Sequence, residues 1–163
     1  MCKLKQCAKR SPHKKQNLRT LNVNYQGIVN KRAEFSAMVN YVKPDVIFGI
    51  ESWLQPAILS SEVFPDNYVA YGKDRGSLGE EVFILVHKNL VSTAQPELDA
   101  NTEMIWAKIH MQGSKDLFLG CFYMPHRSPA DLTELDKTLQ KITRKHSGKQ
   151  VLLAGDFNCP DIN

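Results

Sequence analysis

"VLLAGDFNCPDIN", residues 151–163, places a continuous apolar run immediately before Gly155, Asp156 and Asn158. A short apolar run that stops at polar residues is typical of a buried strand. Because Asp156 and Asn158 are two apart, both would point the same way in an extended segment. Gly155 would let another backbone, or a phosphate, approach closely. Asp-x-Asn after a strand is also a common turn, since both side chains bond to the backbone there.

The segment before this strand predicts a helix. Ser128-Pro129 is a capping residue followed by proline in the first turn, and Gly148 is placed to end the helix. Basic residues near its end oppose the helix dipole favourably. Apolar side chains recur at helical spacing on one face, at Leu132, Leu135, Leu139 and Ile142.

The rest of the chain alternates between strand and helix patterns. Pro44 blocks continuation of the predicted helix before it, and the strands at 68–74 and 82–87 are expected to form a hairpin. Strand–helix–strand units near both ends, with hairpins between them, predict an α/β fold with a mixed sheet. The predicted elements are strands at 18–23, 45–50, 68–74, 82–87, 105–111, 117–123 and 150–154, and helices at 28–43 and 128–148.

Charge is distributed unevenly along the 163 residues. Residues 1–33 carry nine Lys and Arg and no acid, whereas residues 34–163 carry twelve basic and seventeen acidic residues. Because residues 34–163 are net acidic, this part of the chain is not expected to bind phosphate backbones in general. We expect residues 1–17 to form a basic, disordered tail, with a nucleic-acid contact or a localisation signal as the alternatives, and residues 18–163 to form one domain.

Composition also limits the compartment and the metal chemistry. No apolar stretch approaches the roughly 18 residues of a membrane span, and no signal-peptide core is present, so we expect an intracellular protein without a membrane partner, in nucleus or cytoplasm. The cysteines match no disulfide framework, which favours reduced thiols. A zinc site at Cys2, Cys7 and His13 lacks a fourth ligand.

Polar residues at the ends of predicted strands predict the functional site. Asn22, Glu51, Tyr123, Asp156 and Asn158 all fall there, where sites gather in sheets covered by helices. Carboxylate and amide oxygens suit Mg²⁺ or Mn²⁺ and not zinc. Each residue taken alone also fits a solvated strand end or a turn.

These motifs together resemble the exonuclease-endonuclease-phosphatase domains. The resemblance runs from about Leu18 to the C-terminus and is strongest to the endonuclease domain of non-LTR retrotransposon polyproteins. Its most specific pieces are Pro-Asp-x-x-x-x-x-Glu-x-Trp-Leu and Gly-Asp-Phe-Asn. The motifs are LNV at 21–23, NK at 30–31, PDVIFGIESWL at 44–54, YVAYGKDR at 68–75, EMIWAKI at 103–109, GCFYMPH at 120–126 and LLAGDFNCP at 152–160.

The resemblance implies a two-sheet α/β sandwich and Mg²⁺-dependent cleavage of phosphodiester or phosphoester bonds. Glu51 would bind the metal, with Asn22 beside it. Asp156 and Asn158 would position the attacking water and hold phosphate oxygens, and Tyr123 would support the transition state. An attacking water near a metal-held phosphate needs this orientation and charge neutralisation.

The sequence also departs from the family pattern. Two acidic residues, Glu80 and Glu81, replace glycines before the central hairpin, and Met124 stands where Arg is frequent. Family members continue past Gly-Asp-Phe-Asn into a part that supplies another Asp and an Asp-His pair, which His126 and His146 do not replace. We therefore expect a truncated domain with an uncovered inner sheet face, an open edge, and weak or no activity.

Three functions stay open at this point. The first is an Mg²⁺-dependent endonuclease acting on DNA, ancestrally of a non-LTR retrotransposon. The second is a phosphoesterase of the same superfamily acting on a small or lipid phosphoester. The third is a non-catalytic relic or a module that binds nucleic acid through the basic N-terminal tail. No obligate protein partner is evident.

Overall fold

The computed structural model describes residues 17–54, 60–72, 80–100, 102–111, 113–145, 148 and 150–159. The expected basic tail therefore falls outside the described residues except for Asn17, and so does the zinc alternative at Cys2, Cys7 and His13.

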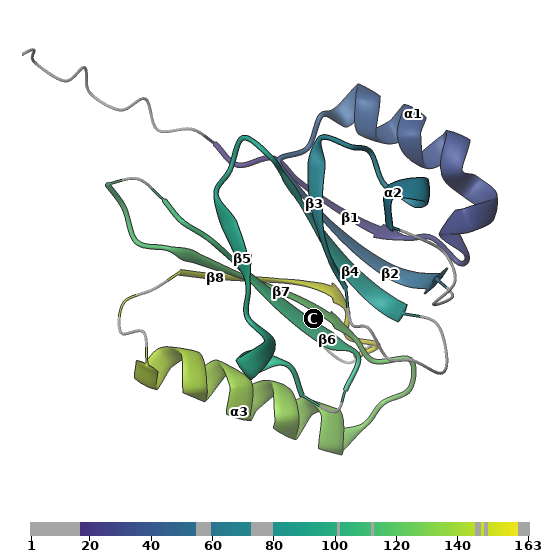
Figure 1. Ribbon diagram of the computed structural model, residues 1–163. Coiled ribbons are helices and arrows are strands. Elements are labelled where there is room, and N and C mark those ends of the chain that lie inside the picture. The colour runs from purple at the N-terminus through teal and green to yellow at the C-terminus, as the bar shows by residue number, and fades with distance from the viewer. Residues whose placement is uncertain are drawn as a thin grey trace, which may run out of the picture.

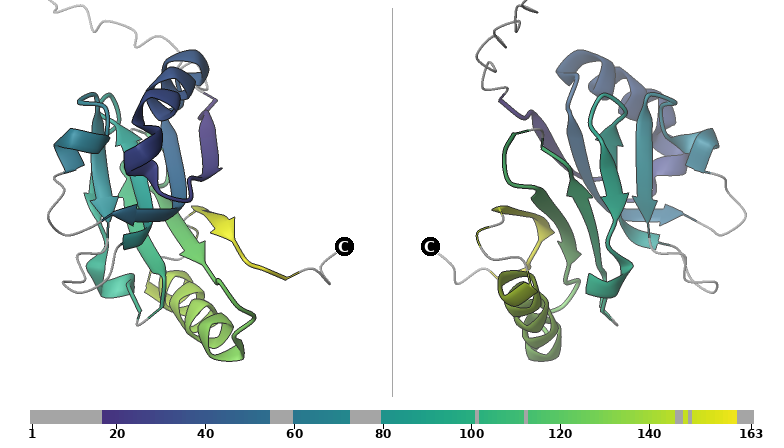
Figure 2. Two further views of the ribbon diagram at one scale, coloured as in Figure 1. Left: turned by 90° about the vertical axis from the view of Figure 1, so that its right-hand side faces the viewer. Right: turned by 60° about the vertical axis from the view of Figure 1, so that its left-hand side comes forward.

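Two four-stranded sheets pack face to face, and helices cover their outer faces (Figures 1 and 2). The strand orders are β1-β2-β4-β3 and β5-β6-β7-β8. In each sheet one edge pair, β1–β2 or β7–β8, is parallel and the other pairs are antiparallel. The predicted α/β sandwich is thus confirmed. The strands are β1 (Thr20–Asn24), β2 (Val46–Leu54), β3 (Tyr68–Gly72), β4 (Glu80–His87), β5 (Ser92–Ala94), β6 (Met104–Ile109), β7 (Leu117–Tyr123) and β8 (Gln150–Asp156).

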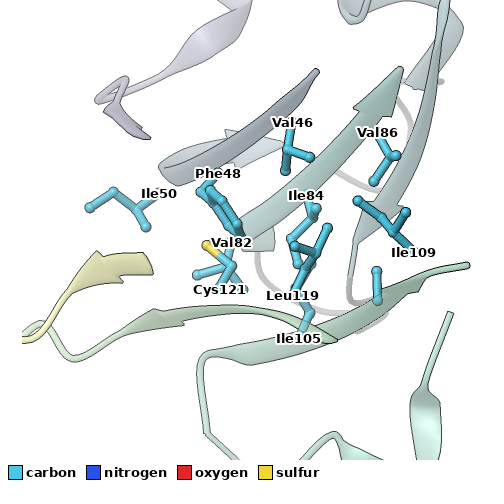
Figure 3. Packing of buried hydrophobic residues seen from close by; sticks show 11 residues of the cluster. Val46, Phe48, Ile50, Val82, Ile84, Val86, Ile105, Ile109, Leu119 and Cys121 are labelled. Atoms are coloured by element: carbon cyan, nitrogen blue, oxygen red, sulfur yellow. The ribbon is translucent and has the colours of Figure 1, made fainter. Parts of the chain in front are cut away.

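The space between the sheets is filled by apolar side chains from both (Figure 3). Phe48 and Ile84 of the first sheet and Leu119 of the second are at most 1% exposed. The expectation of an uncovered inner face is therefore wrong, because β6 and β7 cover it. Among the described strands β8 is an edge strand, as expected, and its Val151 is 41% exposed.

The helices bury one face each, as their apolar spacing predicts. Phe35 of the first helix and Leu135 of the last lie in separate clusters against the outer faces of the two sheets. The first helix begins as a 3-10 turn, ends before Pro44 and closes with Lys43 in the left-handed conformation. The helices are η1 (Ile28–Lys31), α1 (Arg32–Val42), α2 (Ser60–Val63), η2 (Pro96–Leu98) and α3 (Pro129–Lys145).

The predicted cap of α3 is present. Ser128 Oγ accepts a hydrogen bond from the backbone N–H of Asp131, at 3.2 Å, and Pro129 occupies the first turn. Gly148, placed by sequence at the end of this helix, has a φ of +73°. The cap and the glycine therefore bracket a helix whose buried stripe docks on β6 and β7.

Candidate active site

Glu51 occupies an irregular position near the end of β2. The register of β2 on β4 shifts here, because Ile50 pairs with Val82 and Leu54 with Glu80, which leaves three residues of β2 opposite one of β4. Glu51 has a φ of +53°, which is uncommon for a residue other than glycine. Such backbone strain costs about 1–3 kcal/mol and clusters at functional sites. A hydrogen bond from Gly27 N to Glu51 O, at 3.0 Å, holds this backbone to the loop after β1.

The Glu51 side chain is fixed through one of its two carboxylate oxygens. Oε1 accepts hydrogen bonds from Asn24 Nδ2, at 2.7 Å, and from the Tyr123 hydroxyl, at 3.2 Å. Among the described residues none donates to Oε2. The half-buried carboxylate is therefore oriented from both sheets while keeping one oxygen available to a ligand.

The two asparagines of β1 differ from the expectation. Within the described residues Asn22 makes no hydrogen bond to Glu51; its Nδ2 donates to the backbone oxygen of Gly155 in β8, at 3.3 Å. The residue beside Glu51 is Asn24, which sequence reasoning missed. Asn24 lies two residues beyond Asn22 and so shares its face of the strand, a signal that was available.

Asp156 ends β8, and the chain turns immediately after it. Asn158 has a φ of +43°, and its backbone N–H donates to Asp156 Oδ1 at 2.9 Å. The extended geometry in which both side chains would point the same way is absent, because residues 156–158 form the side-chain-to-backbone turn that the sequence also allowed. Asn158 Nδ2 donates to Met124 O at 2.8 Å, which ties this turn to the segment after β7.

The two sheets bring these side chains to one end of the sandwich. Tyr123 pairs with Asp156 in the β7–β8 ladder and reaches Glu51 across the sandwich. Edge strands β1 and β8, which belong to different sheets, are joined by the hydrogen bond from Asn22 Nδ2 to Gly155 O. All five residues singled out by sequence therefore lie in or beside this one set of contacts.

Gly155 makes this approach possible. A Cβ atom at Gly155 would lie 1.8 Å from the backbone oxygen of Phe122, and the φ of Gly155 is +132°. No other residue type fits that combination without backbone movement. The predicted close approach of another backbone is confirmed, and the backbone is that of β7.

The donor set fits a hard divalent cation. Within the described residues no group of three or more His, Cys, Asp and Glu could hold a metal ion. Mg²⁺ is usually bound by only one or two carboxylates and keeps several waters. The carboxylates of Glu51 and Asp156, with the amide oxygens of the asparagines, match that pattern.

The nearest buried thiol takes no part in this chemistry. Cys121 is fully buried between the sheets, and its Sγ lies 3.6 Å from Gly49 O. Burial raises the pKa of the Cys121 thiol to about 12, so the thiol stays neutral near pH 7. A neutral, enclosed thiol is not a nucleophile.

No helix within the described ranges is long and apolar enough to cross a membrane.

Comparison with known proteins identifies the fold. No protein-family model matches the chain, and no curated protein matches it in sequence. Among solved structures, the endonuclease domain of TRAS1, a telomere-specific non-LTR retrotransposon, has a TM-score of 0.65 at 17% identity, covering 86% of this chain and 58% of that one. D. rerio TDP2 complexed with a single-strand DNA product gives 0.63 at 18% identity, covering 88% and 62%.

The catalytic domain of human Nocturnin gives a TM-score of 0.62 at 13% identity, with 86% of this chain and 64% of that one covered. The chain thus spans less than two thirds of the length of each of these structures. At such identities the likeness shows the fold alone, and this chain has the fold of the exonuclease-endonuclease-phosphatase domains, as its motifs predict.

Proposed function

We propose that this chain is part of a metal-dependent phosphodiesterase domain that cleaves DNA, of the kind found in non-LTR retrotransposons. The observation that carries the proposal is the Glu51 carboxylate, which Asn24 and Tyr123 hold through one oxygen while the other accepts from none of the described residues. Supporting hydrogen bonds of this kind hold a binding carboxylate in the orientation that its ligand requires.

DNA is the favoured substrate because solved structures of similar fold contain bound DNA. One structure of TDP2 contains a single-strand DNA product, and the Neisseria 3′ phosphatase NExo, with a TM-score of 0.58 at 12% identity, is bound to a product DNA hairpin. The TRAS1 domain is itself described as an endonuclease. These are properties of those proteins, and they support the same substrate class here.

The residues divide into metal-holding and water-orienting groups. Glu51, through its second carboxylate oxygen, and Asn22, through its amide oxygen, would hold Mg²⁺ or Mn²⁺. When bound, that cation would neutralise charge on the phosphate oxygens. The Tyr123 hydroxyl donates to Glu51 Oε1 and would support the transition state by keeping this carboxylate in place.

Asp156 and Asn158, at and just after the end of β8, would act from the second sheet at the same end of the sandwich. Asp156 Oδ1 already accepts from the Asn158 backbone, so its second oxygen is the one left to accept a proton from the attacking water. The Asn158 amide donates to Met124 O and therefore fixes the loop that follows Tyr123. Asn158 would thus hold Asp156 and the segment after Tyr123 in fixed positions relative to each other.

The test uses metal binding and nicking together. Mn²⁺ binding to the chain is measured by water proton relaxation, and Mg²⁺-dependent nicking is scored on supercoiled plasmid. Glu51→Gln should weaken Mn²⁺ binding by roughly tenfold or more and reduce any nicking by about 100-fold. Glu134→Gln, an exposed acid on α3 paired with Lys137, serves as the matched control and should behave as wild type.

Equal Mn²⁺ affinity in wild type and Glu51→Gln would refute the metal role of Glu51. Nicking that persists in EDTA would refute metal dependence altogether. Circular dichroism of both variants checks that any loss is not unfolding.

A second candidate, hydrolysis of a small phosphoester, is favoured by one further comparison. ANGEL2, named as a 2′,3′-cyclic phosphatase, shares the fold with a TM-score of 0.58 at 15% identity. Parallel assays of 2′,3′-cyclic nucleotide hydrolysis and duplex nicking separate the two. Faster, Glu51-dependent release from the small substrate would favour this alternative over DNA cleavage.

A further inference from the structure

A second polar pocket lies at the opposite end of the first sheet from Glu51. Its volume is about 290 Å³, at the lower limit of the roughly 300–1,000 Å³ of small-molecule sites. Asp45, which lines it, precedes the first residue of β2, and Glu51 follows six residues later. At about 3.3 Å per residue the two lie roughly 20 Å apart along the strand. The pocket is lined by Val39, Asn40, Lys43, Pro44, Asp45, Asn67, Tyr68, His87 and Asn89.

The floor of this pocket is preformed. Val39 and Tyr68 are 4% and 7% exposed, and Pro44 is buried. The Tyr68 hydroxyl donates to Pro44 O at 2.6 Å, and the Tyr68 ring packs edge-on against the imidazole of His87 with 5.2 Å between centroids. These contacts hold the apolar base and the half-buried imidazole without any ligand.

The rim is rich in hydrogen-bond donors. Within the described ranges, the side chains of Asn40, Lys43, Asn67 and Asn89 make no hydrogen bond or ion pair. His87 Nδ1 accepts from the backbone N–H of Asn89 at 3.2 Å, which places the proton of the neutral ring on Nε2 as another donor. The pocket therefore offers an ammonium, an imidazole N–H and three amides.

The side chains of the pocket offer fewer hydrogen-bond acceptors than donors. Asp45 Oδ2 already accepts from the backbone N–H of Arg19 at 2.8 Å, so one carboxylate oxygen is left for a ligand hydroxyl or amine. A donor-rich rim around a single acceptor suits a ligand with an anionic group and a polar body. Charge-assisted hydrogen bonds from an ammonium are stronger than neutral ones, so the anion would lie toward Lys43.

We propose that this pocket is a second binding site, separate from the candidate active site, that takes a small phosphomonoester of mononucleotide size. Lys43 and His87 bind the phosphate, the asparagine amides and Asp45 bind the polar body, and Val39 and Tyr68 support its apolar face. The proposal does not depend on phosphodiesterase activity.

The test follows binding by two-dimensional amide NMR of the whole chain. The probes are AMP, adenosine and inorganic phosphate. AMP should shift the side-chain amide signals of Asn40, Asn67 and Asn89, and should bind at least tenfold more tightly than either adenosine or phosphate.

Lys43→Asn removes the ammonium and suits the backbone. Lys43 has a φ of +49°, a conformation that asparagine adopts readily, so the variant should fold as wild type. It should weaken AMP binding at least tenfold. Lys88→Asn, next to His87 in sequence but not lining the pocket, is the matched control and should leave AMP binding within about twofold.

Three results would overturn the proposal. The first is no amide shift with AMP at millimolar concentration. The second is equal binding of adenosine or phosphate and AMP, because one half of the ligand would then go unrecognised. The third is AMP binding that Glu51→Gln abolishes and Lys43→Asn leaves unchanged, which would place AMP at the candidate active site. Failure of the nicking and Mn²⁺ assays leaves this test unaffected.

Discussion

Replacing Gly155 by alanine tests how closely β7 and β8 must approach at the candidate active site. The added Cβ would lie 1.8 Å from the Phe122 backbone oxygen and 2.8 Å from its carbonyl carbon. Neither atom can rotate away as a side chain would, because both belong to the ladder between β7 and β8. The two strands must therefore separate, which also displaces the Gly155 oxygen that accepts from Asn22.

Two contributions set the size of the effect. Holding a residue other than glycine at a φ of +132° costs about 1–3 kcal/mol. Forcing an extra carbon into a packed interior costs about another 1–3 kcal/mol. We expect Gly155→Ala to lower the free energy of unfolding by about 4 kcal/mol, a large part of the 5–15 kcal/mol typical of a domain.

Gly113→Ala separates the two contributions. Gly113 also has a positive φ, +70°, but a Cβ there would meet nothing within 4 Å. This control should lose only about 1–2 kcal/mol. Urea unfolding followed by far-ultraviolet circular dichroism measures both variants. If Gly155→Ala lies within about 0.5 kcal/mol of Gly113→Ala, the steric argument is wrong and β8 is not held against β7 as described.

Two further predictions concern stability. The Tyr25 hydroxyl is buried without a partner in the described part of the chain, and burial, then the charge of Glu34, raises its pKa to about 12. In the unfolded chain this hydroxyl ionises near pH 10, so the free energy of unfolding should fall between pH 10 and 12. Urea unfolding of Tyr25→Phe should show a smaller fall over that range. At pH 7 the same variant should gain about 1 kcal/mol, because it no longer buries an unpaired hydroxyl. An unchanged pH profile in Tyr25→Phe would contradict this. Ser128→Ala should remove the α3 cap and about 1 kcal/mol, a fall of about 2–4 °C in melting temperature that exposed Ser114→Ala should not reproduce.

Local patterns in the sequence were enough to place most elements. The strand predicted at 117–123 has the bounds of β7, and the helix predicted from Ser128 begins at Pro129. These signals are local, because apolar periodicity, a capping hydroxyl and a proline act within a turn or a strand. The short strand β5, Ser92–Ala94, was missed because three residues are too few to show a period.

The candidate site was predicted as a set of residues but not as a set of contacts. Sequence placed Glu51, Tyr123 and Asp156 at strand ends, and the structure brings them to one end of the sandwich. Sequence could not decide whether Asn22 or Asn24 meets Glu51, since both lie on the same face of β1. The parallel register that pairs Asn24 with Ile50 decided it.

The sequence by itself determined most of the strands and both long helices, and which polar side chains stand near the ends of those strands. The tertiary structure alone decided that β6 and β7 cover the inner face of the first sheet, that Asn158 turns back on Asp156, and that Glu51 is held from both sheets. The reason is physical. Secondary structure follows from interactions between near neighbours, whereas the register of strands far apart in the chain depends on how two whole faces pack.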